Sequence, residues 1–210
     1  MKEPISQALY DYWNEVRGDR LAPRRFEIEP SRIAGMLPDT FILERINPAM
    51  LRFRLAGTRI GDTFGLEFRG VNIFDLFREE DRITLQRQAS VIVRQGAVGV
   101  FIIEAAAESG QTARFEMIAL PLIHTRDVVD RLLGSLTPLD RPRWLGTMPL
   151  TITRIVEHEL VWPDGRPHAM IDSAQRQTPF KPHVREARIV RADRRQFRVY
   201  DGGLSLQEDE

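Results

Sequence analysis

The stretch FRLAGTRIGDTFGLEFRG, residues 53–70, decides the fold expected for this chain. It begins as a strand, because Phe53 and Leu55 alternate with an arginine between them, and the strand ends at the first glycine. The rest of the stretch has too much glycine for a stable helix and too little alternation for a strand, yet it contains Phe64 and Phe68. We expect these aromatic side chains to wall a small cavity.

The patterns on either side of this stretch predict an α+β fold. Apolar residues recur every three to four positions in residues 5–17, as in an amphipathic helix, and a longer helix is expected over residues 80–95. Strands are expected at 40–46, 51–56, 98–107, 113–123 and 131–139. Their short links favour antiparallel pairing, and the separation of strands from helices is typical of the α+β class.

The composition excludes several kinds of site. The 210 residues include 30 basic and 30 acidic ones and no cysteine. The balanced charge gives no sign of nucleic acid or an anionic membrane as partner of the whole chain. Without cysteine there is no disulfide, iron–sulfur cluster, thiolate zinc site, cysteine nucleophile or flavin–cysteine adduct. Because the N-terminus lacks a signal-peptide pattern and no window is apolar enough to span a membrane, we expect a cytoplasmic protein.

Four segments carry a resemblance to the PAS domain family, and in particular to a group of short, stand-alone bacterial PAS proteins. They are LYDYWNEVRGDRLAPRR at 9–25, FRLAGTRIGDTFGLEFRG at 53–70, ALPL at 119–122 and LLGSLTPL at 132–139. The resemblance covers about residues 5–140. It implies a five-stranded antiparallel sheet with short helices and one longer helix on one face, plus an N-terminal helix. It also implies a sensory or signalling role, since many PAS domains bind a small molecule, haem or flavin between the sheet and the helices.

The expected organisation has four parts. They are an N-terminal helix and connector (1–30), a PAS-like core (31–141), a segment that can add one more strand (142–162) and a proline- and arginine-rich C-terminal tail (163–210). Within the tail, residues 166–198 contain nine basic and three acidic residues. This segment can contact nucleic acid or an acidic protein surface, but its composition and its few aromatic residues favour a solvated tail.

Apolar side chains of the strands and helices are expected to line the cavity that the aromatic stretch walls. The candidates are Phe53, Leu55, Ile60, Phe64, Phe74, Leu85, Ile92, Phe101, Ile103, Phe115 and Met117. The alternative is that the same side chains fill the core completely, as they do in most protein interiors. The pattern alone does not separate a ligand pocket from a filled core.

Cofactors and catalysis find little support in the sequence. The axial ligand of haem-binding relatives is commonly a histidine on the longer helix, and residues 80–95 contain none. Covalent flavin needs a cysteine, non-covalent flavin has no positive sign, and EHE at 157–159 lacks the spacing of a helical zinc motif. Glu104 and Glu116 lie on consecutive expected strands, where two close carboxylates can do acid–base chemistry, but their apolar neighbours favour solvent-facing positions. We therefore expect no metal site, no catalytic residues and no enzymatic activity.

The apolar stripe of the N-terminal helix needs a surface that buries it. The stripe comprises Leu9, Tyr12, Trp13 and Val16. It can pack on the protein's own sheet or on the same helix of a second chain, and the resemblance favours the homodimer.

The sequence therefore predicts a PAS-type sensory module that binds a small hydrophobic or mixed-polarity ligand or a partner protein. Two alternatives stay open. One is an adaptor with a filled core that binds protein or nucleic acid through its basic tail. The other is a small enzyme on a cupped α+β sheet, which would need polar residues in the cavity.

Overall fold

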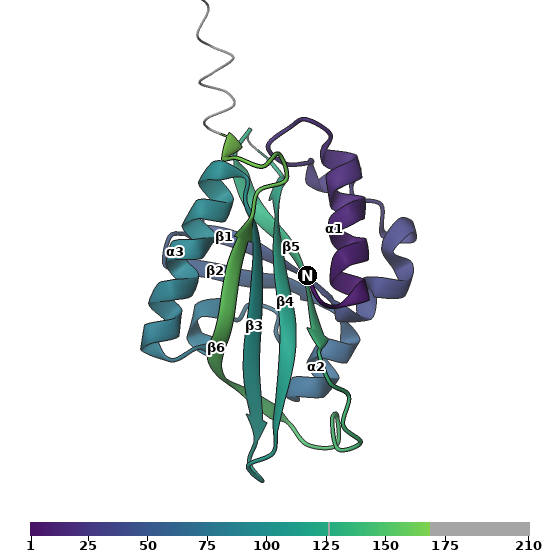
Figure 1. Ribbon diagram of the computed structural model, residues 1–210, viewed down its shortest axis with the longest axis vertical. Coiled ribbons are helices and arrows are strands. Elements are labelled where there is room, and N and C mark those ends of the chain that lie inside the picture. Colours follow the sequence, from purple (N-terminus) through teal and green to yellow (C-terminus); the bar gives the residue numbers. More distant parts are fainter. Residues whose placement is uncertain (126, 169–210) are drawn as a thin grey trace, which may run out of the picture. The chain divides into compact units, whose positions relative to one another are not determined.

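The computed structural model describes residues 1–125 and 127–168 (Figure 1). Its centre is an antiparallel sheet with the strand order β2-β1-β5-β4-β3-β6. The strands are β1 (Thr40–Asn47), β2 (Met50–Ala56), β3 (Val98–Ala107), β4 (Thr112–Ile123), β5 (Val129–Pro138) and β6 (Leu150–Val161). The expected antiparallel α+β architecture is confirmed, but the prediction of five strands is wrong.

The sixth strand, β6, extends the sheet beyond β3. It pairs antiparallel with β3 from Val98 opposite Val161 to Ala107 opposite Leu150, over nearly the whole length of both strands. The free edge of β3 would otherwise expose a row of unpaired backbone groups, and β6 covers them. Beyond β6, most of the predicted tail, including nearly all of the basic segment 166–198, lies outside the described residues.

Helices cover both faces of the sheet. The helical elements are α1 (Pro4–Arg17), η1 (Arg25–Glu27), η2 (Pro30–Asp39), α2 (Thr58–Phe64), η3 (Ile73–Leu76) and α3 (Glu79–Gln95). One hydrophobic cluster joins α2, η3 and α3 to the first face, and a second cluster joins α1 and η2 to the other face. None of the helices in residues 1–125 and 127–168 is long and apolar enough to cross a membrane.

The middle strand β4 shows why both faces can be covered. Met117 and Ala119 belong to the first cluster, whereas Ile118 and Leu120 belong to the second. Successive side chains of a strand point to opposite faces, so a strand buried on both faces carries a continuous apolar run. The ALPL segment is part of this run.

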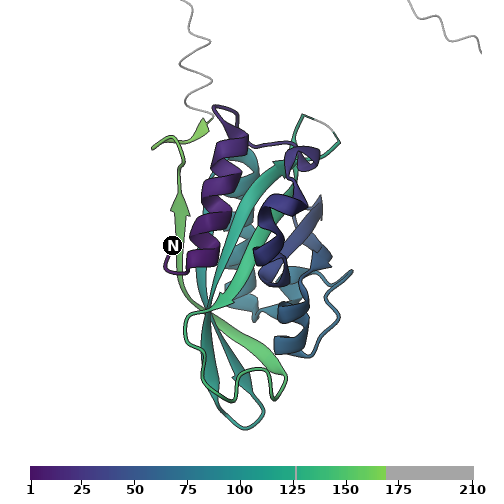
Figure 2. The same ribbon diagram turned by 90° about the vertical axis from the view of Figure 1, so that its right-hand side faces the viewer.

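The helix α1 lies along the second face of the sheet (Figure 1, Figure 2). Leu9 and Trp13 are fully buried there and Tyr12 is nearly so, while Val16 is half-buried. The Trp13 indole N–H also donates a hydrogen bond of 2.8 Å to the carbonyl of Pro121. The protein's own sheet therefore buries the stripe, and the dimer role of these four residues stays a prediction.

The motif of residues 53–70 folds largely as a cover over the first face. Phe53 packs against Phe68, with the ring centroids 4.9 Å apart, and Phe64 packs against Phe68 at 5.9 Å. Gly57 lies between β2 and α2, and its φ of −66° is one that every residue adopts. Its role is close approach: a Cβ atom there would lie nearer than 3.0 Å to backbone atoms of η2.

Leu55 is the one predicted cavity residue that does not join the first cluster. A β-bulge places Ile42 opposite Leu55 and Leu43 opposite Phe53, so that Arg54 has no partner on β1. The extra residue shifts the alternation, and Leu55 turns to the second face with Ile42. Because α1 packs on β4 and β5 and not on β2, Leu55 is left 47% exposed. The prediction that it lines a cavity is wrong.

Candidate functional site

The space between the sheet and α3 is almost filled by side chains. The remaining void measures about 10 Å³, which is room for at most one water molecule. Among its walls are four of the predicted cavity residues: Leu85, Ile92, Phe101 and Met117. In this structure the centre of the predicted cavity is packed core.

An open pocket of about 270 Å³ lies to one side of this core, beside α2. Its walls come from α2, the end of η2, the paired ends of β4 and β5, and the loop that follows β5. The lining residues are Asp39, Arg59, Ile60, Asp62, Thr63, Phe64, Phe115, Leu136, Pro138, Arg141, Pro142, Leu145 and Gly146. Three predicted cavity residues, Ile60, Phe64 and Phe115, are therefore part of this pocket.

Aromatic and aliphatic side chains form the apolar part of the pocket. Phe64 from α2 and Phe115 from β4 pack with their ring centroids 5.4 Å apart. Ile60 is one helical turn before Phe64, so both project from the same side of α2. Leu136 and Leu145 add aliphatic surface from β5 and the loop after it. Such a surface suits a flat or ring-shaped apolar group.

Charged side chains form the polar part of the pocket. Asp39, the last residue of η2, is 1% exposed, and its Oδ2 atom accepts a hydrogen bond from the guanidinium of Arg59. Its Oδ1 atom is buried and has no hydrogen-bond partner within the described residues. Asp62 and Arg141 also line the pocket. The lining thus contains two acidic and two basic side chains, and one buried acceptor that is not used.

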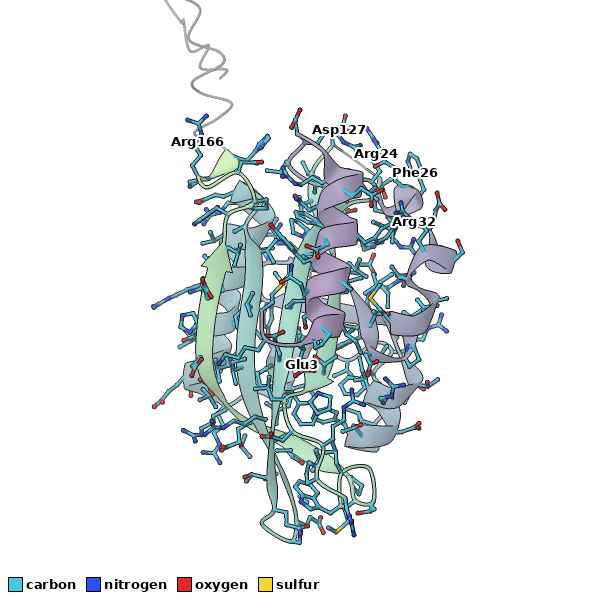
Figure 3. The ribbon with its side chains drawn as sticks, turned by 45° about the vertical axis from the view of Figure 1, so that its right-hand side comes forward. Glu3, Arg24, Phe26, Arg32, Asp127 and Arg166 are labelled. Carbon is cyan, nitrogen blue, oxygen red and sulfur yellow. The ribbon has the colours of Figure 1, made fainter. Side chains whose placement is uncertain are left out.

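On the opposite face, the same paired ends of β4 and β5 hold the start of α1. Glu116 accepts hydrogen bonds from the backbone N–H groups of Lys2, at 2.5 Å, and Glu3, at 3.0 Å. The hydroxyl groups of Ser6 and Ser135 lie 3.2 Å apart. Burial and the nearby Glu116 carboxylate raise the pKa of Glu3. Glu3 is the N-cap residue of α1 (Figure 3).

The burial of Glu116 corrects the expectation for one of the two glutamates. Glu116 was expected to face solvent, but it is fully buried beneath the start of α1. Glu104 accepts a hydrogen bond of 3.0 Å from Arg154, which lowers the pKa of Glu104. Each carboxylate thus has its own structural partners.

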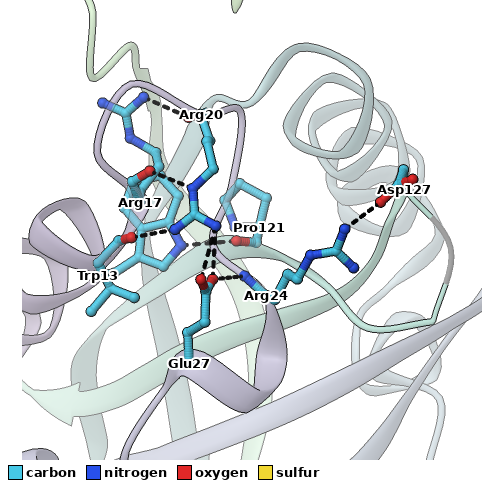
Figure 4. A network of polar contacts seen from close by, with 8 residues as sticks. Trp13, Arg17, Arg20, Arg24, Glu27, Pro121 and Asp127 are labelled. Atoms are coloured by element: carbon cyan, nitrogen blue, oxygen red, sulfur yellow. Dashed lines mark hydrogen bonds and ion pairs between the residues drawn. The ribbon is translucent and has the colours of Figure 1, made fainter.

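Ion pairs hold the other end of α1 and the connector after it, and Figure 4 shows those of Arg20 and Arg24. The buried Arg17 forms a two-pronged pair with Asp164, at 2.9 and 3.0 Å, which ties α1 to the chain beyond β6. The Nη1 group of Arg20 donates to both carboxylate oxygens of Glu27, at 2.9 and 3.0 Å. Arg24 reaches Asp127 at 2.6 Å. Together with Glu116, these contacts fix α1 at both ends.

Sequence reasoning missed the polar half of the pocket. Asp39, Arg59 and Arg141 come from three separate segments, and no spacing in the sequence brings them together. A single aspartate between two elements is usually exposed, so its burial carried no sequence signal. No group of three or more potential metal ligands occurs in the described part of the chain.

The chain is similar to the crystal structure of the Rhodobacter sphaeroides LOV protein, with 14% identity and a TM-score of 0.41, over 54% of this chain and 70% of that one. It is also similar to the d2 variant of RsLOV, with 18% identity and a TM-score of 0.39, over 49% of this chain and 60% of that one. No curated protein sequence matches it. A family profile described as a PAS domain matches residues 1–137, and with its antiparallel sheet and helical cover the chain belongs to the PAS domain family.

Proposed function

We propose that this protein is a sensory or signalling module that binds a small molecule in the pocket beside α2 and has no catalytic activity of its own. PAS domains are generally sensory or signalling modules, and the chain belongs to that family. The pocket combines an apolar wall with a few charged groups, as ligand sites usually do. Among its described lining residues there is no histidine or cysteine to serve as a base or nucleophile.

One observation carries the proposal: the pocket and the anchor of α1 share the same short stretch of sheet. Phe115 and Leu136 line the pocket, and their sequence neighbours Glu116 and Ser135 contact the start of α1. The two strands are hydrogen-bonded to each other there, with Ile118 opposite Ser135. Alternation along a strand therefore puts the ligand-facing and the α1-facing side chains on the same few backbone units.

This arrangement gives a direct route from the pocket to α1. A ligand that displaces Phe115 or Leu136 also moves the backbone that positions Glu116 and Ser135. Lys2 and Glu3, the two residues just before α1, donate their backbone N–H groups to Glu116, so the start of the helix loosens or tightens in response. A partner protein that contacts α1 would read the change as a shift between two states of the helix.

The proposal is tested by a screen of small ring compounds that follows backbone amide shifts by NMR. Compounds that bind are expected to shift the amides of Ile60 and Phe64 and to change hydrogen exchange in α1. The variant Thr63→Trp places a large side chain in the pocket and should abolish both effects. Thr58→Trp is the matched control, because Thr58 is exposed on the same helix and does not line this pocket.

Two results would contradict the proposal. In one, no compound shifts the pocket amides. In the other, compounds bind in the pocket but leave hydrogen exchange in α1 unchanged, which would remove the coupling across the sheet.

A further inference from the structure

We propose that the pocket beside α2 selects neutral ring compounds that carry a hydrogen-bond donor, such as a phenolic hydroxyl, and that Asp39 is the residue that selects them. This inference rests on the proposed function, because it names the class of ligand for the same pocket. Its basis is the buried oxygen of Asp39 that has no partner within the described residues.

The buried carboxylate of Asp39 can accept a further hydrogen bond from a ligand. An ionised carboxylate only accepts hydrogen bonds, and its two oxygens offer about four acceptor positions. Arg59 occupies a position on Oδ2, whereas Oδ1 is shielded from water and unpaired. A buried polar group without a partner destabilises the structure, so a ligand that donates to it recovers that free energy. A ligand that offers only acceptors recovers nothing.

The charges around the pocket favour a neutral ligand. Arg59 already balances the charge of Asp39, and Asp62 and Arg141 contribute one charge of each sign. A cationic ligand beside Asp39 would lie next to the Arg59 guanidinium, which repels it. An anionic ligand would face the unpaired oxygen of Asp39. A neutral hydroxyl group is not repelled by the Arg59 guanidinium and brings no second negative charge to Asp39.

The apolar wall and the volume set the size of the ligand. The pair of Phe64 and Phe115, together with Leu136 and Leu145, accepts a ring and excludes an extended polar chain. About 270 Å³ is close to the lower limit of roughly 300 Å³ for small-molecule pockets. The pocket therefore suits a compound of one ring or two small ones.

The unpaired oxygen can reach such a ligand by a small motion. The terminal torsion of an aspartate has a broad range, so the carboxylate can rotate without leaving its rotamer well. The side chain of Arg59 is 48% exposed, so the guanidinium can follow this rotation. After the rotation one oxygen faces Arg59 and the other faces the pocket.

Binding of phenol and toluene, measured by NMR titration of the full chain, tests the inference. The two probes have nearly the same shape, and only phenol donates a hydrogen bond. Phenol is expected to bind about ten- to a hundredfold more tightly than toluene, as one hydrogen bond to a buried carboxylate provides. Benzoate, the anionic ring of similar size, should bind more weakly than phenol.

Variants identify the group responsible. Asp39→Ala should reduce the phenol-to-toluene ratio to about one, whereas Asp19→Asn, at an exposed position outside the lining, should leave the ratio unchanged. Should Asp39→Ala not fold, Asp39→Asn keeps the shape and should lower the ratio, because hydrogen bonds to a charged acceptor are about twice as strong as those to a neutral one.

The outcomes separate this inference from the proposed function. If toluene and phenol shift the pocket amides with equal affinity, the pocket binds ligands but the role of Asp39 is wrong. If the preference for phenol persists without the Asp39 carboxylate, the donor is bound elsewhere and the inference is also wrong. If neither probe nor any other ring compound shifts those amides, the proposed function itself fails.

Discussion

Replacing Gly57 with alanine tests why the 53–70 motif needs a glycine before α2. The φ of Gly57 is −66°, which every residue adopts, so conformational freedom gives no reason for a cost. The added Cβ, however, would lie nearer than 3.0 Å to the carbonyl oxygens of Leu37 and Pro38. Both are backbone atoms of η2 and cannot swing aside as a side chain would, so α2 and η2 must separate.

The expected loss in the free energy of unfolding is about 3–4 kcal/mol. Inserting one extra carbon into a packed site costs about 1–3 kcal/mol, and two backbone contacts place this site at the upper end. Separation also strains the 2.8 Å hydrogen bond from the Gly57 N–H to the Thr40 carbonyl, which adds about 1 kcal/mol.

Urea unfolding followed by tryptophan fluorescence measures this loss, and Gly61→Ala is the matched control. Gly61 lies inside the same helix, and a Cβ there would meet its nearest neighbour, the Leu66 carbonyl oxygen, at an ordinary 3.6 Å. This control should be stabilised by about 0.5–1 kcal/mol, because alanine suits a helix better than glycine does. A Gly57→Ala protein as stable as the wild type would refute the close-approach explanation.

Three further predictions concern the core, the anchor of α1 and one ion pair. Phe53→Ala should lower the free energy of unfolding by about 3–5 kcal/mol and Leu55→Ala by less than about 1 kcal/mol, because only the first side chain is buried; similar losses in urea unfolding would contradict the β-bulge. Glu116→Ala should lower the free energy of unfolding by about 1–3 kcal/mol and speed hydrogen exchange in the first turn of α1. Unchanged exchange there would show that the carboxylate does not hold the helix. Arg154→Ala should raise the pKa of Glu104, measured by carbon-13 NMR. Because this pKa is lowered in the folded protein, the ion pair stabilises the fold above the unfolded pKa and is lost as the pH falls through the folded one; an unshifted titration would count against the pair.

The elements with strong local patterns could be predicted from the sequence. The helix expected over residues 5–17 is α1 at Pro4–Arg17, and the helix expected over 80–95 is α3 at Glu79–Gln95. Both follow from spacing within one segment. The strand expected over 51–56 also forms, as β2. Leu55, which alternation places on the inward face, points to the other face. The bulge that turns Leu55 away depends on its register against β1, and local alternation contains no information about a partner strand.

The candidate site was harder to predict than the fold, for two physical reasons. The aromatic cover predicted a cavity, yet whether packed side chains leave a void depends on volumes that a pattern does not contain. The lining of the pocket beside α2 includes four charged side chains, and Asp39 is buried where η2, α2 and β5 meet. Ile60, Phe64 and Phe115 were identified because their apolar character was itself the signal.

The burial of α1 on the sheet limits how the helix can move in the proposed signalling. Beneath the helix lies an apolar strip, and exposing it to water is unfavourable. The strip comprises Ile118, Leu120, Leu122 and Leu133. A state in which α1 leaves the sheet therefore needs another surface that covers the strip at once. The helix would leave and a second molecule would bind in one concerted step. The rate at which α1 leaves the sheet should then rise with the concentration of the molecule that binds the strip. Without that molecule, protein with the strip exposed should aggregate.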